Sequence, residues 1–336
     1  MPNPRTIRAG IIGLGVGEQH LKSYASIEGV KVVAVCDIDP HRLQDVAYRW
    51  KVSETYTDFS KVTEHPDIDV VSICSFDDAH ADQAVSAFNN GKHVMVEKPV
   101  ALTRQDAARV LRAQQDSGKW ITSNLILRES PRFIEVRDQV RAGAFGEVFH
   151  IEGDYVHDIL WKITDGWRGK MDTYSIVYGG GIHLIDLMRW ILGDEFCEVC
   201  AIGSNRRAAG SSYRFDDTVT SLFKFENGAS GKCLTTLGPK RTKFHALNVY
   251  GSARTFINDI PDAKSFVSDN PDDERVVTTP YPGMKKGDLI PNFIEAIRAG
   301  LEPNVSARDV FRIMDVCFAV VESLESKRTE QISYQI

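Results

Sequence analysis

The feature that most constrains the fold is the alternation of short apolar runs with amphipathic stretches across residues 7–124. Runs rich in β-branched residues that alternate with helical patterns are typical of βαβ units, in which helices cover a parallel sheet. Gly91 and Gly118 follow two of the helical patterns, where a left-handed C′ residue is expected. The pattern predicts strands at residues 7–12, 31–36, 70–74, 93–96 and 120–124, and helices at 18–27, 41–50, 79–89 and 104–117.

The pattern changes after Arg128, and the four strands predicted between residues 197 and 250 follow one another without intervening helices. Such a succession indicates an antiparallel or mixed sheet. Asn227-Gly228 stands between two of these strands and favours a tight hairpin with a type I′ turn. Strands are predicted at residues 147–157, 197–204, 217–225, 229–237 and 244–250, and helices at 131–142, 183–192, 289–299 and 307–327.

The length of 336 residues accommodates two domains of common size. We predict an α/β fold, with a Rossmann domain and its doubly wound parallel sheet at residues 1–124 and an α+β domain at residues 125–336. A formal net charge of -6 argues against nucleic acid and against a membrane surface as partners, because both attract positively charged proteins. The apolar run within residues 1–15 is too short for a signal peptide or a membrane span, so we expect a cytoplasmic location.

The six cysteines are spread thinly over a long chain, which does not resemble a secreted disulfide framework. Cys197 and Cys200 form a lone C-x-x-C without a second pair of ligands. They stand in a stretch with a period of two, which favours buried strand residues over a zinc site. The sequence therefore predicts no bound metal.

A glycine-rich loop follows the first predicted strand directly and precedes a helix. It consists of Gly13, Leu14, Gly15, Val16 and Gly17. In such a loop backbone N–H groups and a helix N-terminus can face a pyrophosphate, and glycines are needed where Cβ atoms would block the approach. The usual G-x-G-x-x-G spacing is not met, because Glu18 stands at the final glycine position and the third glycine comes one residue early. A merely structural glycine turn is the alternative.

Asp37 ends the second predicted strand, 22 residues after Gly15. An acidic side chain at this place accepts hydrogen bonds from the adenosine ribose of a dinucleotide and repels a 2′-phosphate. We therefore expect NAD as the cofactor. Arg42 keeps NADP as the less favoured alternative, because an arginine can accommodate the 2′-phosphate.

Glu97, Lys98 and Pro99 follow the apolar strand at residues 93–96. Open α/β sheets bind their ligands outside the carboxyl ends of the strands, so this acid and base stand at a position suited to chemistry. A solvated surface lysine is the alternative.

Motifs spread through most of the chain resemble those of one known family. They are Gly10-Ile-Ile-Gly-Leu-Gly, Val70-Val-Ser-Ile-Cys, Gly91-Lys-His-Val with Glu97-Lys98-Pro99, Gly166-Trp-Arg, Gly179-Gly-Gly-Ile-His183-Leu-Ile-Asp186 and Asn292-Phe-Ile-Glu-Ala-Ile-Arg. On these residues the chain resembles the Gfo/Idh/MocA oxidoreductases, named for glucose-fructose oxidoreductase, inositol dehydrogenase and a rhizopine-catabolism protein. The resemblance implies that the second domain has a large, open, mostly antiparallel sheet, through which homodimers or homotetramers form.

The resemblance also implies roles for single residues. Lys98 looks like the lysine that hydrogen-bonds the reacting hydroxyl, and His183 looks like the histidine that exchanges its proton. An imidazole suits that exchange at neutral pH, and an ammonium group stabilises developing negative charge on the oxygen. Cofactor binding is implied for Ser75, His80, Glu97, Lys98, Trp167 and Arg168. Substrate binding is implied for Tyr178 and Asp186, beside Lys98 and His183.

One position departs from the family pattern. Many sugar dehydrogenases of the family have D-x-G-x-H, and Gly179 stands here where that aspartate would be. The missing carboxylate puts in question either the proton transfer or the substrate hydroxyl that it would bind. Tyr174 and Tyr178 are near in sequence and could supply a hydrogen bond instead.

The function that these residues favour is hydride transfer between a nicotinamide cofactor and a ring alcohol of a sugar, an inositol or a nucleotide sugar. Lys162, Arg168, Lys170, Lys240, Arg241 and Lys243 could supply cations for an anionic substrate, although solvated loop charges explain them equally. Two alternatives stay open. One is a non-catalytic regulator that binds NAD or NADP, and the other is an enzyme that reduces an imine or an unsaturated bond.

Overall fold

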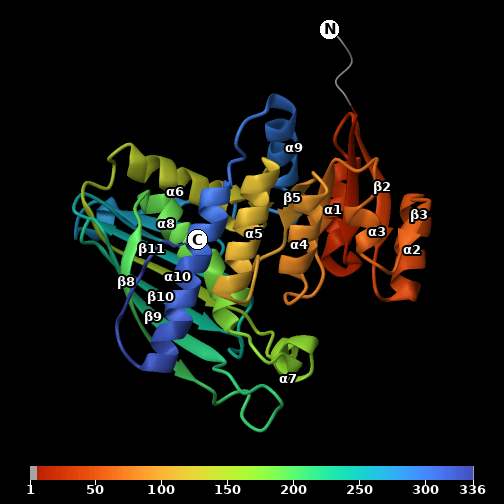
Figure 1. The fold of residues 1–336 in the computed structure, drawn as a ribbon. Helices are drawn as coiled ribbons and strands as arrows, with labels where there is room; N and C mark the ends of the chain where they lie inside the picture. The colour runs from red at the N-terminus through yellow and green to blue at the C-terminus, as the bar shows by residue number, and fades with distance from the viewer. Residues whose placement is uncertain (1–5, 336) are drawn as a thin grey trace. The chain divides into compact units, whose positions relative to one another are not determined.

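Two units divide residues 6–335, which the computed structural model describes (Figure 1). The first unit runs to Ile126 and includes the later segment Lys285–Met314, whereas the second holds Leu127–Met284 and Asp315–Gln335. The sequence analysis placed residues 285–314 with the second domain. They join the first unit through contacts such as the hydrogen bond of 2.8 Å that the Ser23 hydroxyl donates to the Gly287 carbonyl.

The sheet of the first unit is parallel throughout, with the strand order β3-β2-β1-β4-β5-β6. This order is that of a Rossmann fold, so the predicted doubly wound sheet is confirmed. The strands are β1 (Ile7–Ile12), β2 (Val30–Cys36), β3 (Glu54–Tyr56), β4 (Val70–Ile73), β5 (His93–Val96) and β6 (Ile121–Ser123). The helices are α1 (Leu14–Ala25), α2 (Pro40–Trp50), α3 (Ser60–Thr63), α4 (His80–Asn89), α5 (Arg104–Ser117) and the later α9 (Ile290–Ala299).

Local signals set the ends of these helices. The Asp39 carboxylate accepts hydrogen bonds from the backbone N–H groups of His41 and Arg42, which caps the start of α2, and Pro40 occupies its first turn. Gly118 ends α5 in the left-handed conformation that the sequence predicts. Helix α1 begins at Leu14, four residues before the predicted start, so the glycine loop and the first helical turn are one segment.

The second unit contains a nine-stranded sheet with the order β14-β13-β12-β11-β7-β10-β9-β8-β15. Only the pair β7 and β10 is parallel among its neighbours in the described residues, so the prediction of a large, mostly antiparallel sheet is confirmed. Its strands are β7 (Val148–Val156), β8 (Phe196–Ser204), β9 (Thr218–Phe225), β10 (Ser230–Thr236), β11 (Phe244–Gly251), β12 (Thr255–Ile257), β13 (Ala263–Phe266), β14 (Arg275–Val277) and β15 (Glu330–Gln331). Its helices are α6 (Pro131–Arg141), α7 (Trp161–Thr164) and α8 (Ile182–Leu192), whereas α10 (Ala307–Ser326) contributes residues to both units.

Alternating burial shows which face of this sheet the helices cover. Along β9, Val219, Phe223 and Phe225 are buried, whereas Leu222 on the opposite face is 55% exposed. Burial alternates with a period of two along a strand because successive side chains point to opposite faces of the sheet. Ile202 on β8 is 73% exposed, so apolar side chains also stand on the open face.

The hairpin between β9 and β10 corrects one prediction. A type I′ turn requires positive φ at both central residues, but only Gly228 has a positive φ, of 92°, in this connection. The Gly228 N–H donates to the Phe225 carbonyl at 3.0 Å. The connection is therefore a three-residue loop, in which glycine takes the left-handed position after an ordinary turn.

Cys197 and Cys200 lie on β8 as predicted, but both are half-buried rather than buried. Among residues 6–335, no helix has the length and the apolar composition needed to cross a membrane.

Candidate functional site

The predicted cofactor residues of the first unit gather at one edge of its sheet. Gly13 follows β1, Asp37 follows β2, Ser75 follows β4 and Glu97 follows β5. Because all these strands are parallel, their carboxyl ends meet at the same edge. The strand order reverses between β1 and β4, and such a switch point is where open α/β sheets bind their ligands.

Each glycine of the loop has different surroundings. A Cβ atom on Gly13, which has a φ of 83°, would lie 2.5 Å from the backbone of Cys74, and one on Gly17 would lie 2.8 Å from Ile11 Cγ2. Gly17 thus provides the close packing of helix on strand that the third glycine of a dinucleotide loop provides. The third glycine therefore comes one residue early, as the sequence indicates, and the loop is one residue shorter than usual.

A Cβ atom on Gly15 would meet nothing within 4 Å. The space beside the second glycine is thus open where a pyrophosphate approaches the loop. The first turn of α1 adds backbone N–H groups that lack partners within the helix. The loop therefore fits a dinucleotide.

The Asp37 carboxylate is hydrogen-bonded to backbone N–H groups on both sides of it along the chain. The Leu14 N–H donates to its Oδ2 at 2.7 Å and the Asp39 N–H donates to its Oδ1 at 2.9 Å. A carboxylate can accept further hydrogen bonds, so ribose hydroxyls remain compatible with this geometry. Arg42 Nη1 lies 3.5 Å from Asp37, so this arginine pairs with the carboxylate that disfavours a 2′-phosphate.

A buried polar network lies beneath these loops, and the sequence analysis did not predict it. His20 Nδ1 is 3.2 Å from the Ser72 hydroxyl oxygen, and His20 Nε2 is 3.4 Å from Glu97 Oε1. The Asn124 amide donates to the same Glu97 oxygen at 2.7 Å. The sequence signal for this network is a polar residue at positions that the strand and helix patterns place in the core. It becomes informative only when the order of the strands in the sheet is known.

This network keeps Glu97 ionised. Burial raises the pKa of Glu97, but the hydrogen bond and charge of His20, with the ammonium groups of Lys286 and Lys98, outweigh it and hold that pKa well below its usual range. The Glu97 side chain is 9% exposed and is directed into the unit. Its geometry therefore suits positioning of the neighbouring Lys98, which is half-buried, more than direct contact with a cofactor.

His80 connects two of the loops. Its Nδ1 lies 2.7 Å from the Pro99 carbonyl oxygen and its Nε2 lies 3.3 Å from the Ser75 carbonyl oxygen. The Ser75 hydroxyl donates to Gln83 at 2.7 Å. His80 is 1% exposed, so its geometry ties the segment that carries Lys98 to the loop after β4.

His183 lies in the first turn of α8 in the second unit. Its ring stacks on that of Tyr155, with centroids 6.3 Å apart and an angle of 22° between the planes. The side chain is half-buried, so the alternative of a histidine sealed in the core does not hold. A half-buried imidazole is compatible with proton exchange with a ligand.

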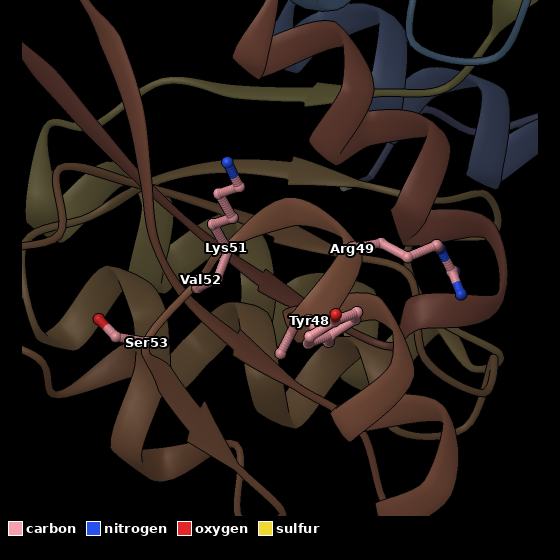
Figure 2. Close-up of a pocket in the computed structure, with 6 residues that line it drawn as sticks. Tyr48, Arg49, Lys51, Val52 and Ser53 are labelled. Atoms are coloured by element: carbon pink, nitrogen blue, oxygen red, sulfur yellow. The ribbon is translucent and has the colours of Figure 1, made fainter.

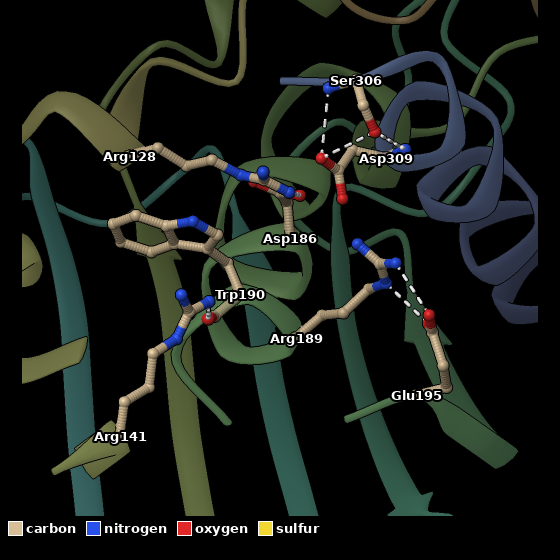
Figure 3. Close-up of polar contacts among 8 residues, drawn as sticks. All are labelled: Arg128, Arg141, Asp186, Arg189, Trp190, Glu195, Ser306 and Asp309. Atoms are coloured by element: carbon tan, nitrogen blue, oxygen red, sulfur yellow. Dashed lines mark hydrogen bonds and ion pairs between the residues drawn. The ribbon is translucent and has the colours of Figure 1, made fainter. Parts of the chain in front are cut away.

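The two residues predicted beside His183 in substrate binding face elsewhere. Asp186 is 1% exposed and forms a two-pronged ion pair with Arg128, at 2.6 and 2.8 Å (Figure 3). Tyr178 is 3% exposed, and its ring packs edge-on against Phe318 at 5.8 Å. These contacts suit positioning of α8, so direct substrate contact by either residue stays a prediction.

Trp167 and Arg168 lie in a short 3-10 helix, Trp167–Lys170. The Arg168 guanidinium stands 4.2 Å from the centre of the Trp167 ring and 5.8 Å from that of Tyr174. Such cation–π contacts favour one position of the arginine side chain.

The rings of three histidines, His157, His183 and His245, pack around Tyr155. Burial raises the pKa of Tyr155 to about 12, although Arg168 opposes this shift. Burial and the ammonium groups of Lys243 and Lys162 lower the pKa of His157 to about 4. The Tyr155 hydroxyl lies 3.2 Å from His157 Nδ1, so these two groups form a neutral hydrogen-bonding pair next to His183.

A surface hollow of about 550 Å³ lies elsewhere in the first unit, at the end of α2 (Figure 2). A helix that connects parallel strands ends at their amino-terminal edge, opposite the edge where ligands bind. This hollow therefore has no part in the candidate site. It is lined by Ala47, Tyr48, Arg49, Lys51, Val52 and Ser53.

The strand order and the glycine loop define the first unit as a dinucleotide-binding Rossmann domain. Comparison with known families agrees: residues 7–125 match the oxidoreductase family with an NAD-binding Rossmann fold, and residues 133–257 match the GFO/IDH/MocA C-terminal domain. The chain belongs to the Gfo/Idh/MocA family of oxidoreductases. The family that the sequence motifs suggest, and NAD as the cofactor of its Rossmann domain, are thus confirmed.

Individual relatives show the extent of the similarity. An inositol 2-dehydrogenase of Salmonella typhimurium is 32% identical over 195 residues, which span 57% of this chain and 56% of that protein. A myo-inositol 2-dehydrogenase of Thermotoga maritima is 25% identical over 97% of this chain and 98% of its own length. Among solved structures, a levoglucosan dehydrogenase in complex with NADH and levoglucosan superposes with a TM-score of 0.86 at 23% identity, covering 98% of this chain and 99% of its own.

Proposed function

We propose that this protein is an NAD-dependent dehydrogenase that oxidises a ring alcohol of a sugar or polyol. The observation that carries the proposal is the carboxyl edge of the Rossmann sheet, where the glycine loop and Asp37 stand beside the segment with Lys98. The relatives named inositol 2-dehydrogenase support a polyol as the substrate.

The chemistry that the chain must supply concerns the alcohol proton. The nicotinamide, when bound, accepts the hydride. Lys98 hydrogen-bonds the reacting hydroxyl and stabilises the negative charge that develops on its oxygen. His183 accepts the proton, because an imidazole is a side chain suited to proton exchange in catalysis. The ionised Glu97 holds the backbone next to Lys98 through its contacts with His20 and Asn124.

A screen of inositols, sugars and nucleotide sugars for NADH formation tests the function. We expect turnover with at least one polyol or sugar, and with NAD in preference to NADP. Tight NAD binding without turnover on any member of the screen would instead favour a regulator of the same fold, for which Gly179 in place of the family aspartate is the supporting observation.

We further propose that the protein is cytoplasmic and that it forms homodimers or homotetramers through the open face of its large sheet. Ile202 and Leu222 are exposed on this face, and large contiguous apolar patches are uncommon on monomers. Light scattering at micromolar concentration tests the association.

A further inference from the structure

Gly179 lies one helical turn before His183. A π-helical turn, Val177–Gly181, leads directly into α8, whose second residue is His183. Residues about one turn apart on a helix project from the same face. A side chain at position 179 would therefore stand on the face that carries the His183 imidazole. Gly179 is itself half-buried, so its surroundings are not sealed from a ligand.

The hydroxyl group of Tyr174 occupies that place. A Cβ atom built on Gly179 would overlap the Tyr174 hydroxyl oxygen, and it would lie 3.3 Å from Tyr174 Cζ. The Tyr174 hydroxyl oxygen and a side chain at position 179 therefore cannot occupy this place together. Only a glycine at position 179 lets the phenol reach this point.

The Tyr174 ring is held firmly in this position. It is 3% exposed, its edge faces the Tyr213 ring at 6.5 Å, and the Arg168 guanidinium stands 5.8 Å from its centre. A buried ring with contacts on two sides brings its hydroxyl to one point with little further loss of conformational freedom. Such pre-organised polar groups give a binding site its specificity.

We propose that the Tyr174 hydroxyl binds a substrate hydroxyl on the His183 face, at the point where a side chain of residue 179 would otherwise stand. The inference rests on the proposed dehydrogenase function and names the residue that determines specificity there. A phenol both donates and accepts a hydrogen bond and is neutral at pH 7, whereas a carboxylate only accepts and is charged. With the Arg168 cation close by, the site accepts a vicinal diol and tolerates an anionic substituent that a carboxylate would repel.

Thermal unfolding of the intact protein tests the steric part without any substrate. Gly179→Ala forces the Tyr174 hydroxyl away, so we expect the Tm to fall by about 2–4 °C or more. Tyr174→Phe removes the overlapping oxygen, so adding Gly179→Ala to Tyr174→Phe should cost clearly less than Gly179→Ala costs alone. Equal costs in the two backgrounds would overturn the placement of the hydroxyl.

Steady-state kinetics test the binding role on a polyol that the wild type oxidises. Tyr174→Phe should lower kcat/KM by about 10- to 100-fold, as loss of a hydrogen bond to a buried partner does, while the Kd for NAD stays unchanged. The matched control is Tyr334→Phe, which removes a hydroxyl bonded to the Phe196 carbonyl at 2.9 Å and should change kcat/KM less than threefold. A substrate analogue that lacks the hydroxyl next to the reacting carbon should react equally slowly with wild type and Tyr174→Phe.

A double variant provides a readout that a purely structural tyrosine would not move. Tyr174→Phe with Gly179→Asp places a carboxylate at the vacated point, so kcat/KM should recover in part and acquire a new ionisation on its acid limb. An active wild type whose Tyr174→Phe variant keeps full kcat/KM overturns this inference alone. A wild type that binds NAD but turns over no alcohol overturns the proposed function, and the binding role with it.

Discussion

The buried ion pair between Arg128 and Asp186 offers a prediction whose size follows from the structure. Its side chains are 4% and 2% exposed, and two hydrogen bonds of 2.6 and 2.8 Å join them. Replacing one member of such a pair leaves a buried charge without compensation and costs about 3–5 kcal/mol. We therefore expect Asp186→Asn to lower the free energy of unfolding by an amount in this range.

Urea unfolding measures this loss, and hydrogen exchange of the α8 amides locates it. The matched control is Asp172→Asn, because Asp172 pairs with Arg214 at 2.7 Å while the two side chains are 99% and 62% exposed. An exposed pair contributes about 0–1 kcal/mol, since water screens it. Removing both members, as in Arg128→Met with Asp186→Leu, should recover much of the stability that Asp186→Asn loses. A loss below about 1 kcal/mol for Asp186→Asn would refute the reasoning.

Four further predictions concern the cofactor, the chemistry, the acid stability and the assembly. Asp37→Ala should narrow the preference for NAD over NADP, measured by titrating both, and stronger NADP binding by the wild type would contradict the role given to Asp37. Lys98→Met and His183→Ala should each lower kcat by at least about 100-fold with NAD affinity largely preserved, and the double variant should lose little more than either single one. The folded-state pKa of Glu97 lies below its unfolded value of about 4.3, so the ionised carboxylate stabilises the fold at pH values above about 4.3. This contribution to the free energy of unfolding is lost as the pH falls from there through the folded-state pKa. The stability difference between wild type and Glu97→Gln should therefore shrink below about pH 4, and a constant difference down to acid unfolding would argue against this. Leu222→Lys should reduce self-association in light scattering, and a wild type that stays near 37.5 kDa would reject association through the open face.

Most of the regular structure could be predicted because its signals are local. Strands β1 and β5 and helix α5 have the predicted bounds, since each combines a continuous apolar period with turn or cap residues at its ends. Strands β3, β12, β13, β14 and β15 escaped prediction, because each has only two to four residues and so short a strand shows no period unless neighbouring residues extend the pattern. They become strands because a neighbouring strand supplies their hydrogen bonds.

The motifs of the candidate site were also readable from short stretches of chain. The glycine loop and the tripeptide Glu97-Lys98-Pro99 each predict a binding or catalytic segment from a few consecutive residues, because the function requires a particular local backbone conformation. What each side chain faces depends on residues far away in the sequence. Glu97, expected at the cofactor, turns inward to His20, 77 positions before it, and Asp186, expected at the substrate, pairs with Arg128, 58 positions before it.

The sequence by itself determined the fold class, the dinucleotide loop and the family, because these depend on periodicity and on short motifs. The tertiary structure alone decided that residues 285–314 pack with the first unit and that Gly17 performs the work of the third glycine. It also decided that the Tyr174 hydroxyl occupies the point where a side chain of residue 179 would stand. The physical reason is common to all three: which atoms fill a given space depends on how separate segments pack, and no local pattern of residues encodes that packing.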